Sequence, residues 1–194
     1  MGIYISEGNR RMKIPTFSLI SRHTCPNATD LCKRYCYAKK AEIYHNPFIS
    51  RLDNTFSSIK NTFIEDIIKV ISKKNCKYLR IHESGDFYSQ QYLEKWFEIC
   101  KRFPNITFLC YTQMYNLNWN GIPSNLIRYW SIWPDSKGVP KEGLKAYVID
   151  NGKGKIPSIQ LPEAIHHCHK GKTLTCENCL YCFNGNGNVA FKIH

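Results

Sequence analysis

The sequence has no long apolar run and few acidic residues. No stretch approaches the roughly 18 apolar residues that a membrane helix requires, and the first residues lack the charged-then-apolar pattern of a secretory signal. Only 15 Asp and Glu stand against 27 Lys and Arg, which gives a formal net charge of +12. We therefore expect a protein without a membrane segment, located in a cytoplasm.

The positive charge is the first indication of a partner. An excess of this size is typical of proteins that bind nucleic acid or a phosphorylated ligand. The basic residues are nevertheless scattered, with only short pairs at Arg10-Arg11, Lys39-Lys40 and Lys73-Lys74. A solvated surface explains this pattern equally well, so both interpretations stay open.

Length and cysteine content define the class of protein. A chain of 194 residues with 43% hydrophobic residues is long enough for one domain with an ordinary core. Ten cysteines are many for a cytoplasmic protein, and a thiol-reducing compartment disfavours disulfides. Clustered cysteines are therefore interpreted as metal ligands or catalytic groups.

Predicted strands and helices alternate over the first two thirds of the chain. The predicted strands are 13–20, 76–82, 106–112, 125–133, 144–149 and 188–194, and the predicted helices are 37–45, 50–74 and 89–103. This order predicts an α/β fold with a mostly parallel sheet. A complete eight-unit barrel takes about 250 residues, so we expect a partial TIM-like barrel over 1–150, with a cysteine-rich C-terminal extension over 151–194.

The helix predicted over 50–74 has the clearest periodicity. Its apolar positions are Leu52, Phe56, Ile59, Phe63, Ile67 and Ile71. Their spacing of three or four residues predicts one buried face, with Arg51 and Lys60 on the solvent side. Asn46-Pro47 is expected to end the preceding helix.

Three cysteines follow the first long strand in the pattern Cys25-x6-Cys32-x3-Cys36. A loop this short can bring three thiols to one inorganic centre. Three ligands suit a cubane [4Fe–4S] cluster in which one iron takes another ligand, whereas structural zinc normally has four protein ligands. Cys25, Cys32 and Cys36 are therefore the first candidate cluster ligands.

A second group contains Cys168 and the run Cys176-x2-Cys179-x2-Cys182. The run matches the start of the bacterial ferredoxin pattern. A zinc site built from the same thiols, or with His166, His167 or His169 replacing one, is the alternative.

The two cysteine groups allow either one cluster or two. Each group holds its own centre, or the N-terminal thiols take a fourth ligand from the C-terminal run. The remaining cysteines, Cys76, Cys100 and Cys110, are expected to be buried small hydrophobic residues.

The loop after the predicted strand 76–82 has the sequence His82-Glu83-Ser84-Gly85-Asp86-Phe87. The carboxyl ends of parallel strands are where α/β proteins bind ligands. His82, Glu83, Asp86 and, from the next strand, Thr112 are therefore candidates for a pocket. The alternative is that Asp86 caps the following helix and His82 is a core residue.

Several of these segments, in this order, resemble the gene product 88-like family of phage proteins. The resemblance rests on Cys25-Pro-x4-Leu-Cys32-x3-Cys36-Tyr37-Ala38, the Ser84-Gly85-Asp86-Phe87 loop, Tyr111-Thr112, the C-terminal cysteine run and the last residues from Val189 to His194. It implies a viral iron–sulfur protein, located in the host cytoplasm, with a fold akin to the partial barrels of radical S-adenosylmethionine enzymes. Those enzymes usually present Cys-x3-Cys-x2-Cys, so the placement of the cysteines agrees and their spacing differs.

The leading hypothesis is thus an oxygen-sensitive iron–sulfur protein with one or two [4Fe–4S] clusters. If it is an enzyme, it is a redox or radical S-adenosylmethionine-like enzyme, and binding of S-adenosylmethionine at an open iron is a hypothesis that follows from the three-cysteine loop. The alternatives are a non-catalytic zinc-binding module that binds nucleic acid, and an electron carrier without a substrate.

Overall fold

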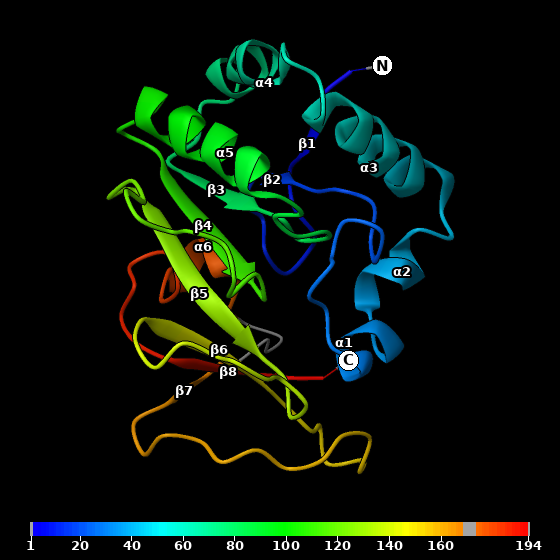
Figure 1. Ribbon diagram of the computed structural model, residues 1–194, viewed down its shortest axis with the longest axis vertical. Helices are drawn as coiled ribbons and strands as arrows, with labels where there is room; N and C mark the ends of the chain where they lie inside the picture. The colour runs from blue at the N-terminus through cyan, green and yellow to red at the C-terminus, as the bar shows by residue number, and fades with distance from the viewer. Residues whose placement is uncertain (1, 169–173, 194) are drawn as a thin grey trace.

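A computed structural model describes residues 2–168 and 174–193. The chain forms a mixed α/β fold around one eight-stranded sheet (Figure 1). The strands lie in the order β1-β2-β3-β4-β5-β6-β8-β7. Their bounds are β1 Ile5–Ser6, β2 Thr16–Phe17, β3 Tyr78–Ile81, β4 Thr107–Thr112, β5 Leu126–Ile132, β6 Leu144–Ile149, β7 His166–His167 and β8 Val189–Lys192.

The sheet is mostly parallel and open. Only β1 pairs antiparallel with its neighbour, and the other six pairings are parallel. Within the described residues, β1 and β7 form the two edges and do not pair with each other. The predicted α/β class with a mostly parallel sheet is confirmed, whereas the partial TIM-like barrel stays a prediction.

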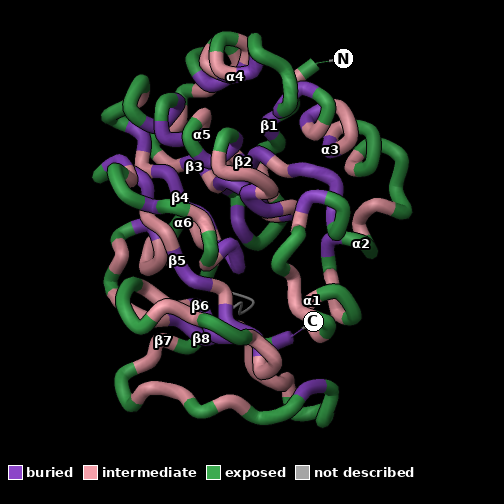
Figure 2. Tube along the Cα trace, viewed as in Figure 1, coloured by how far each residue is buried: buried purple, intermediate pink, exposed green. Residues whose placement is uncertain are grey.

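The helices are α1 Asp30–Arg34, α2 Tyr37–Ala41, α3 His45–Ser58, α4 Phe63–Ser72, α5 Gln90–Arg102 and α6 Cys176–Cys179. Of these, α4 and α5 pack against one face of the sheet. Phe63 and Ile67 of α4 and Trp96 of α5 are fully buried against Leu79 and Phe108 of the sheet. Figure 2 shows this buried layer running along the central strands. The predicted N-cap of α5 is confirmed, since Ser89 Oγ accepts a hydrogen bond from Tyr92 N at 3.2 Å.

The single helix predicted over 50–74 is wrong. The chain forms α3 and α4 instead, with a turn between them in which Lys60 N donates to Ser57 O. The apolar spacing continues across the turn, so it conceals the break. Ile59 is 63% exposed as a result.

Two details at the start of α3 also differ from expectation. Arg51 is buried, because Glu42 provides an ion pair inside the fold. The predicted break at Asn46-Pro47 is wrong as well, because α3 begins at His45 and Pro47 lies in its first turn, where a missing N–H removes no helical hydrogen bond.

The C-terminal segment covers the opposite face of the sheet. Side chains alternate along a strand, so Leu79 faces α4 and α5 while Tyr78 and Arg80 face the other way. Phe183 packs there against Tyr78 and belongs to a core cluster with Met12, Leu109 and Tyr129. In the part of the chain that the structure describes, no helix is long and apolar enough to span a membrane.

Candidate functional site: the cysteine loop and the ends of strands β3 and β4

The three N-terminal cysteines lie in one segment, residues 18–36, which we call the cysteine loop. It starts where β2 ends, and β2 runs parallel to β3 with Phe17 opposite Ile81. The cysteine loop and residues 82–87 therefore leave the sheet from the same edge, where ligands bind in open α/β sheets. Within the loop, Thr29 caps α1 by accepting a hydrogen bond from Cys32 N at 3.2 Å.

The Ser84-Gly85-Asp86-Phe87 loop packs directly against the cysteine loop. Asp86 N donates to Thr24 O at 3.1 Å, and Leu19 N donates to Ser84 O at 2.9 Å. Gly85 has a φ of +88°, and a Cβ at this position would lie 2.6 Å from Leu19 Cβ and 2.7 Å from Thr24 Oγ1. Only glycine permits both this backbone conformation and this approach.

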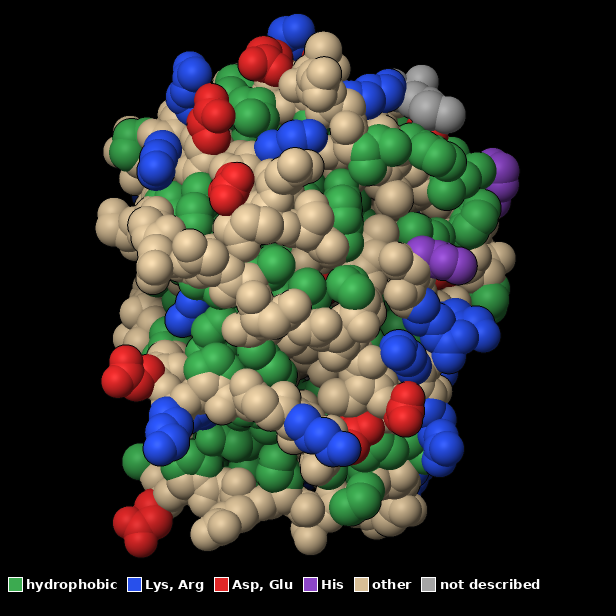
Figure 3. Space-filling model, viewed as in Figure 1, with side chains coloured by type: hydrophobic (Ala, Val, Ile, Leu, Met, Phe, Trp, Pro, Cys, Tyr) green, Lys and Arg blue, Asp and Glu red, His purple; other side chains and the backbone are tan. Residues whose placement is uncertain are grey.

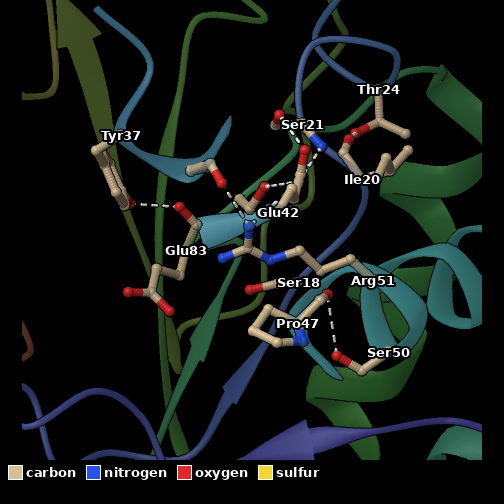
Figure 4. A network of polar contacts seen from close by, with 12 residues as sticks. Ser18, Ile20, Ser21, Thr24, Tyr37, Glu42, Pro47, Ser50, Arg51 and Glu83 are labelled. Carbon is tan, nitrogen blue, oxygen red and sulfur yellow. Dashed lines mark hydrogen bonds and ion pairs between the residues drawn. The ribbon is translucent and has the colours of Figure 1, made fainter. Parts of the chain in front are cut away.

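Glu42 ties the start of the cysteine loop to the helices that follow it (Figure 4). Its carboxylate accepts hydrogen bonds from Ser21 N at 2.8 Å and Ser21 Oγ at 2.7 Å. It also forms an ion pair with Arg51 at 3.2 Å, both side chains being about nine-tenths buried. Arg51 in turn donates to Ala38 O of α2 at 2.9 Å. The segment containing the cysteines is thus fixed at both ends.

The thiols of Cys25, Cys32 and Cys36 are half-buried and influence one another. Burial raises the pKa of Cys25 to about 12, and Asp86 and the other two thiols add to this. Burial likewise raises the pKa of Cys32 to about 12, opposed by a hydrogen bond from Gln113 and supported by Cys36. The shared centre that the sequence predicts for these three residues stays a prediction.

The thiols do not form a ready-made site for one ion. Among the described residues, no three or more His, Cys, Asp or Glu side chains form a group that could hold a metal ion. The ten cysteines form no disulfide either. A cubane cluster differs from a single ion in this respect, because each cysteine binds a different iron and the sulfurs stay farther apart.

Asp86 is the carboxylate whose charge raises the pKa of both Cys25 and Cys32. It is 7% exposed and accepts hydrogen bonds from Thr112 Oγ1 at 2.6 Å, Gln113 N at 2.9 Å and Phe87 N at 2.8 Å. Burial raises the pKa of Asp86 to about 6, and the three hydrogen bonds oppose that increase. Of the four predicted pocket residues, the structure brings Asp86 and Thr112 together, beside Cys25.

His82 and Glu83 lie in other surroundings. His82 is 3% exposed, has a φ of +64° and places Nε2 2.9 Å from the Tyr92 hydroxyl in the aromatic core. Burial lowers the pKa of His82 to about 3. The Glu83 carboxylate accepts from Asn9 Nδ2 at 2.7 Å, and its carbonyl accepts from the Tyr37 hydroxyl.

A polar cavity of about 370 Å³ adjoins the cysteine loop. It is lined by Asn27, Ala28, Thr29, Asp30, Gln113, Tyr115, Asp135 and Lys137. Asp135 Oδ2 accepts from Leu31 N at 2.9 Å, while its buried Oδ1 has no hydrogen-bond partner among the described residues. A second cavity, of about 700 Å³, lies near β6 and β7 and is lined by His166 and Tyr181 among others.

The sequence reasoning missed Glu42 and Asp135 as site residues. Gln113 was expected on the same side as the pocket loop, because it ends the neighbouring predicted strand, and its side chain acts on Cys32. Asp135 follows a later strand in the same way, after Pro134. No local pattern marks Glu42, because its partners Ser21 and Arg51 are far away in the sequence.

The C-terminal cysteines form a second group on the face of the sheet opposite α4 and α5. Cys168, Cys176 and Cys182 pack beside the core cluster of Met12 and Phe183. Burial raises the pKa of Cys182 to about 12, a hydrogen bond from Tyr111 lowers it, and Cys168 and Cys176 raise it. Cys179 ends α6, and His169 lies outside the described residues.

The other predictions for single residues have mixed outcomes. Cys100 and Cys110 are buried in the core as expected, and Cys76 is only half-buried. His166 stacks on Tyr181 with ring centroids 3.9 Å apart.

Comparison with known proteins gives one family. The family model described as Gene product 88 matches residues 4–155. The "Gene 88 protein" of Mycobacterium phage D29 is 28% identical, and that of Mycobacterium phage L5 is 29% identical, each over 196 aligned residues that cover 87% of this chain and 81% of the relative. No solved structure matches the chain.

Proposed function

The chain belongs to the Gene product 88 family, and we propose that it is an iron–sulfur protein in which Cys25, Cys32 and Cys36 hold a cubane [4Fe–4S] cluster. The observation that supports this most is that three half-buried thiols lie in one loop, close enough for their charges to act on one another. That loop stands at the carboxyl ends of parallel strands and is fixed by Glu42 and the Gly85 contact.

The three thiols suit a [4Fe–4S] cluster better than they suit a single metal ion. Three thiols leave one iron for a further ligand, whereas structural zinc normally has four protein ligands. The raised pKa values of Cys25 and Cys32 keep these thiols protonated until a metal displaces the protons. An iron–sulfur cluster supplies one-electron chemistry.

The neighbouring residues position the loop and hold a proton. Asp86 orients Thr112 and the Gln113 backbone, and the Gln113 side chain reaches Cys32. With a pKa near 6, the Asp86 carboxyl holds or releases a proton close to neutral pH. Such a carboxyl suits a redox site at which a proton is transferred together with an electron.

The polar cavity beside the loop is the proposed ligand site. Its volume of about 370 Å³ falls in the range of small-molecule pockets. S-adenosylmethionine is the first ligand to test, and the absence of binding in calorimetry with anaerobically reconstituted protein would remove it.

The proposal is tested by metal analysis of protein purified without oxygen. We expect brown protein that absorbs at about 400 nm and contains iron and sulfide. The triple variant Cys25→Ser, Cys32→Ser and Cys36→Ser should lose iron, while Cys76→Ser, outside both cysteine groups, should keep it. Colourless protein that contains zinc would contradict the proposal and favour a zinc-binding module.

Binding of nucleic acid is a second candidate function, supported by one surface. Exposed basic side chains gather on the cysteine loop and α2, and Figure 3 shows Lys and Arg concentrated where α1 and α2 lie in Figure 1. They are Arg22, Lys33, Arg34, Lys39 and Lys40. The aromatic side chains of Tyr37 and Tyr44 are exposed nearby, as in surfaces on which bases stack.

A labelled single-stranded oligonucleotide tests this surface by fluorescence anisotropy. Binding should weaken steeply with salt and fall at least about tenfold in Lys39→Gln/Lys40→Gln. Lys73→Gln/Lys77→Gln removes the same charge from a distant site and should bind normally. Equal losses in both variants would show only an effect of net charge.

A further inference from the structure

Arg80 is a half-buried cation that takes part in no ion pair among the described residues. It follows Leu79 on β3 and therefore faces the C-terminal segment rather than α4 and α5. Its guanidinium lies 4.8 Å from the centre of the Tyr111 ring, and NH1 lies 3.7 Å from Met12 Sδ. Nε is buried without a hydrogen-bond partner, and none of the four ion pairs among the described residues includes Arg80.

A charged group with a nitrogen shut off from water normally requires compensation. An uncompensated ion inside a protein is strongly unfavourable, so such groups are usually paired with an opposite charge or a metal centre. Burial opposes the charge of Arg80, but the groups around it, Glu83 among them, raise its pKa above the ordinary value. The other groups that act on Arg80 are the hydroxyls of Tyr37 and Tyr111 and the thiol of Cys176.

The C-terminal thiols are the groups that become anionic on metal binding. Cys168, Cys176 and Cys182 pack in one cluster with Tyr111 and Met12. These are the two residues that the Arg80 guanidinium contacts. The segment is attached to the N-terminal strand region, since Cys176 N donates to Arg11 O at 3.1 Å and Glu177 N donates to Met12 O at 3.3 Å. A cation and a hydroxyl donor thus adjoin the same thiol group.

We propose that Cys168, Cys176, Cys179 and Cys182 form a second iron–sulfur centre, separate from the first, and that Arg80 and Tyr111 stabilise its negative charge. The two cysteine groups have opposite electrostatic surroundings. The N-terminal thiols adjoin Asp86, whose backbone N–H donates to Thr24 O next to Cys25. The C-terminal thiols instead pack with Tyr111 and Met12, which the Arg80 guanidinium contacts. A nearby cation and hydrogen bonds to sulfur favour the reduced state of a cluster. The second centre therefore has the higher reduction potential.

This inference rests on the proposed function and extends it to another site. The iron content of two cysteine variants distinguishes a failure of the second centre from a failure of the first. The variant Cys176→Ser/Cys182→Ser should lose about half of the iron and sulfide, as should the triple variant of Cys25, Cys32 and Cys36. Full iron in the C-terminal variant, or zinc in place of its lost iron, would overturn the second centre. Full iron in the N-terminal variant alone would instead overturn the proposed function.

Arg80 and Tyr111 are positioning residues, and their test is a reduction potential. In a redox titration followed by electron paramagnetic resonance, Arg80→Gln should lower the potential of the second centre, Tyr111→Phe should lower it less, and Arg80→Lys should restore most of it. The centre that remains in the C-terminal double variant should keep its potential.

Arg128 offers a matched control on the other face of the sheet. Its guanidinium lies 3.8 Å from the Trp130 ring centre and 5.0 Å from that of Trp119, so Arg128→Gln should leave both potentials unchanged. If Arg80→Gln fails to fold, Tyr111→Phe still decides, because it removes only a hydroxyl. Unchanged potentials in the foldable variants would contradict the proposal.

Discussion

At the scale of single residues, the candidate site depends on backbone conformations that most side chains avoid. Gly85 and His82 both have positive φ and lie on either side of Ser84, directly after β3. Gly85 lets the chain contact Leu19 and Thr24. His82 directs its ring into the aromatic core, so the loop after β3 is held from both sides.

Gly85→Ala should be strongly destabilising. The added Cβ meets Leu19 Cβ and Thr24 Oγ1 and also has a strained φ, and each effect costs about 1–3 kcal/mol. We expect the free energy of unfolding in urea to fall by about 2–5 kcal/mol. Gly121→Ala is the control, because Gly121 has a φ of +75° with no atom within 4 Å of a new Cβ. Equal losses in the two variants would show that the contact with the cysteine loop is unimportant.

His82 should make the stability of the metal-free protein depend on pH. Its pKa in the folded state is about 3, below the ordinary value of about 6.5, so the unfolded chain binds the proton more tightly. The stabilisation is complete above pH 6.5 and decreases as the pH falls below it. Between pH 7 and pH 5 the loss is about 2 kcal/mol.

The comparison of wild type with His82→Asn isolates this effect. Asn tolerates positive φ, and the opposite contribution of Asp86, whose raised pKa favours the folded state at lower pH, is common to both proteins. The difference in unfolding free energy between them should therefore shrink by about 2 kcal/mol from pH 7 to pH 5. A constant difference would mean that His82 is not held neutral by burial.

At the scale of secondary-structure elements, a buried ion pair fixes the segment that carries the cysteines. Glu42 follows α2 and contacts Ser21 before the first cysteine, while Arg51 of α3 contacts Ala38 after the last. The short helices α1 and α2 each have five residues, too few to be stable alone. Their order thus depends on tertiary contacts.

Glu42→Gln should loosen this segment. The change leaves the Arg51 guanidinium buried with a neutral partner, and breaking buried pairs costs about 3–5 kcal/mol, so we expect a loss of about 2–4 kcal/mol in unfolding free energy. Amide hydrogen exchange should accelerate over residues 20–42. Glu98→Gln breaks an exposed pair with Arg102 and should cost less than about 1 kcal/mol. Similar losses in both variants would contradict the role given to Glu42.

Elements with their own periodicity could be predicted from the sequence, whereas those made by tertiary contacts could not. Strands β3 to β6 and helix α5 lie where their apolar patterns and the Ser89 cap predict them. The break between α3 and α4 has no local signal, because the apolar spacing runs through it. The burial of Arg51 depends on Glu42, nine residues away, so a pattern that treats arginine as a surface residue misses it.

The candidate site could likewise be predicted from the sequence only in part. The sequence identifies the cysteines by their spacing and Asp86 by its place at a strand end, and the structure brings Asp86 to Thr112. It also places His82 in the core, which the sequence left as an alternative. Arg80 was overlooked, because a single basic residue in a short strand gives no local indication of what faces it.

At the scale of the whole molecule, the sheet separates two groups of thiols in different electrostatic surroundings. The N-terminal group lies at the carboxyl edge beside Asp86, and the C-terminal group lies on the face that carries Arg80. The C-terminal end of the chain nevertheless reaches the cysteine loop, because Ile193 packs in one cluster with Leu31, Cys32 and Tyr35. Metal binding at the N-terminal thiols should therefore order more than the loop itself.

Cluster binding should protect the cysteine loop from proteolysis. Lys33 and Arg34 are exposed trypsin sites within it, and binding free energy at thiolate sites adds to local folding free energy. We expect cleavage at these residues to slow by about tenfold or more after anaerobic reconstitution. Cleavage at Lys73, between α4 and β3, should change little. A uniform effect on all sites would indicate general stabilisation instead.

The central claim, that Cys25, Cys32 and Cys36 hold a cubane cluster, is tested most directly by Mössbauer spectroscopy of anaerobic protein loaded with labelled iron. Because both cysteine groups are expected to bind iron, the C-terminal variant Cys176→Ser/Cys182→Ser is the sample of choice. The account predicts the signature of a [4Fe–4S] cluster with one iron distinct from the other three. A spectrum of isolated iron ions, or no bound iron at all, would contradict it.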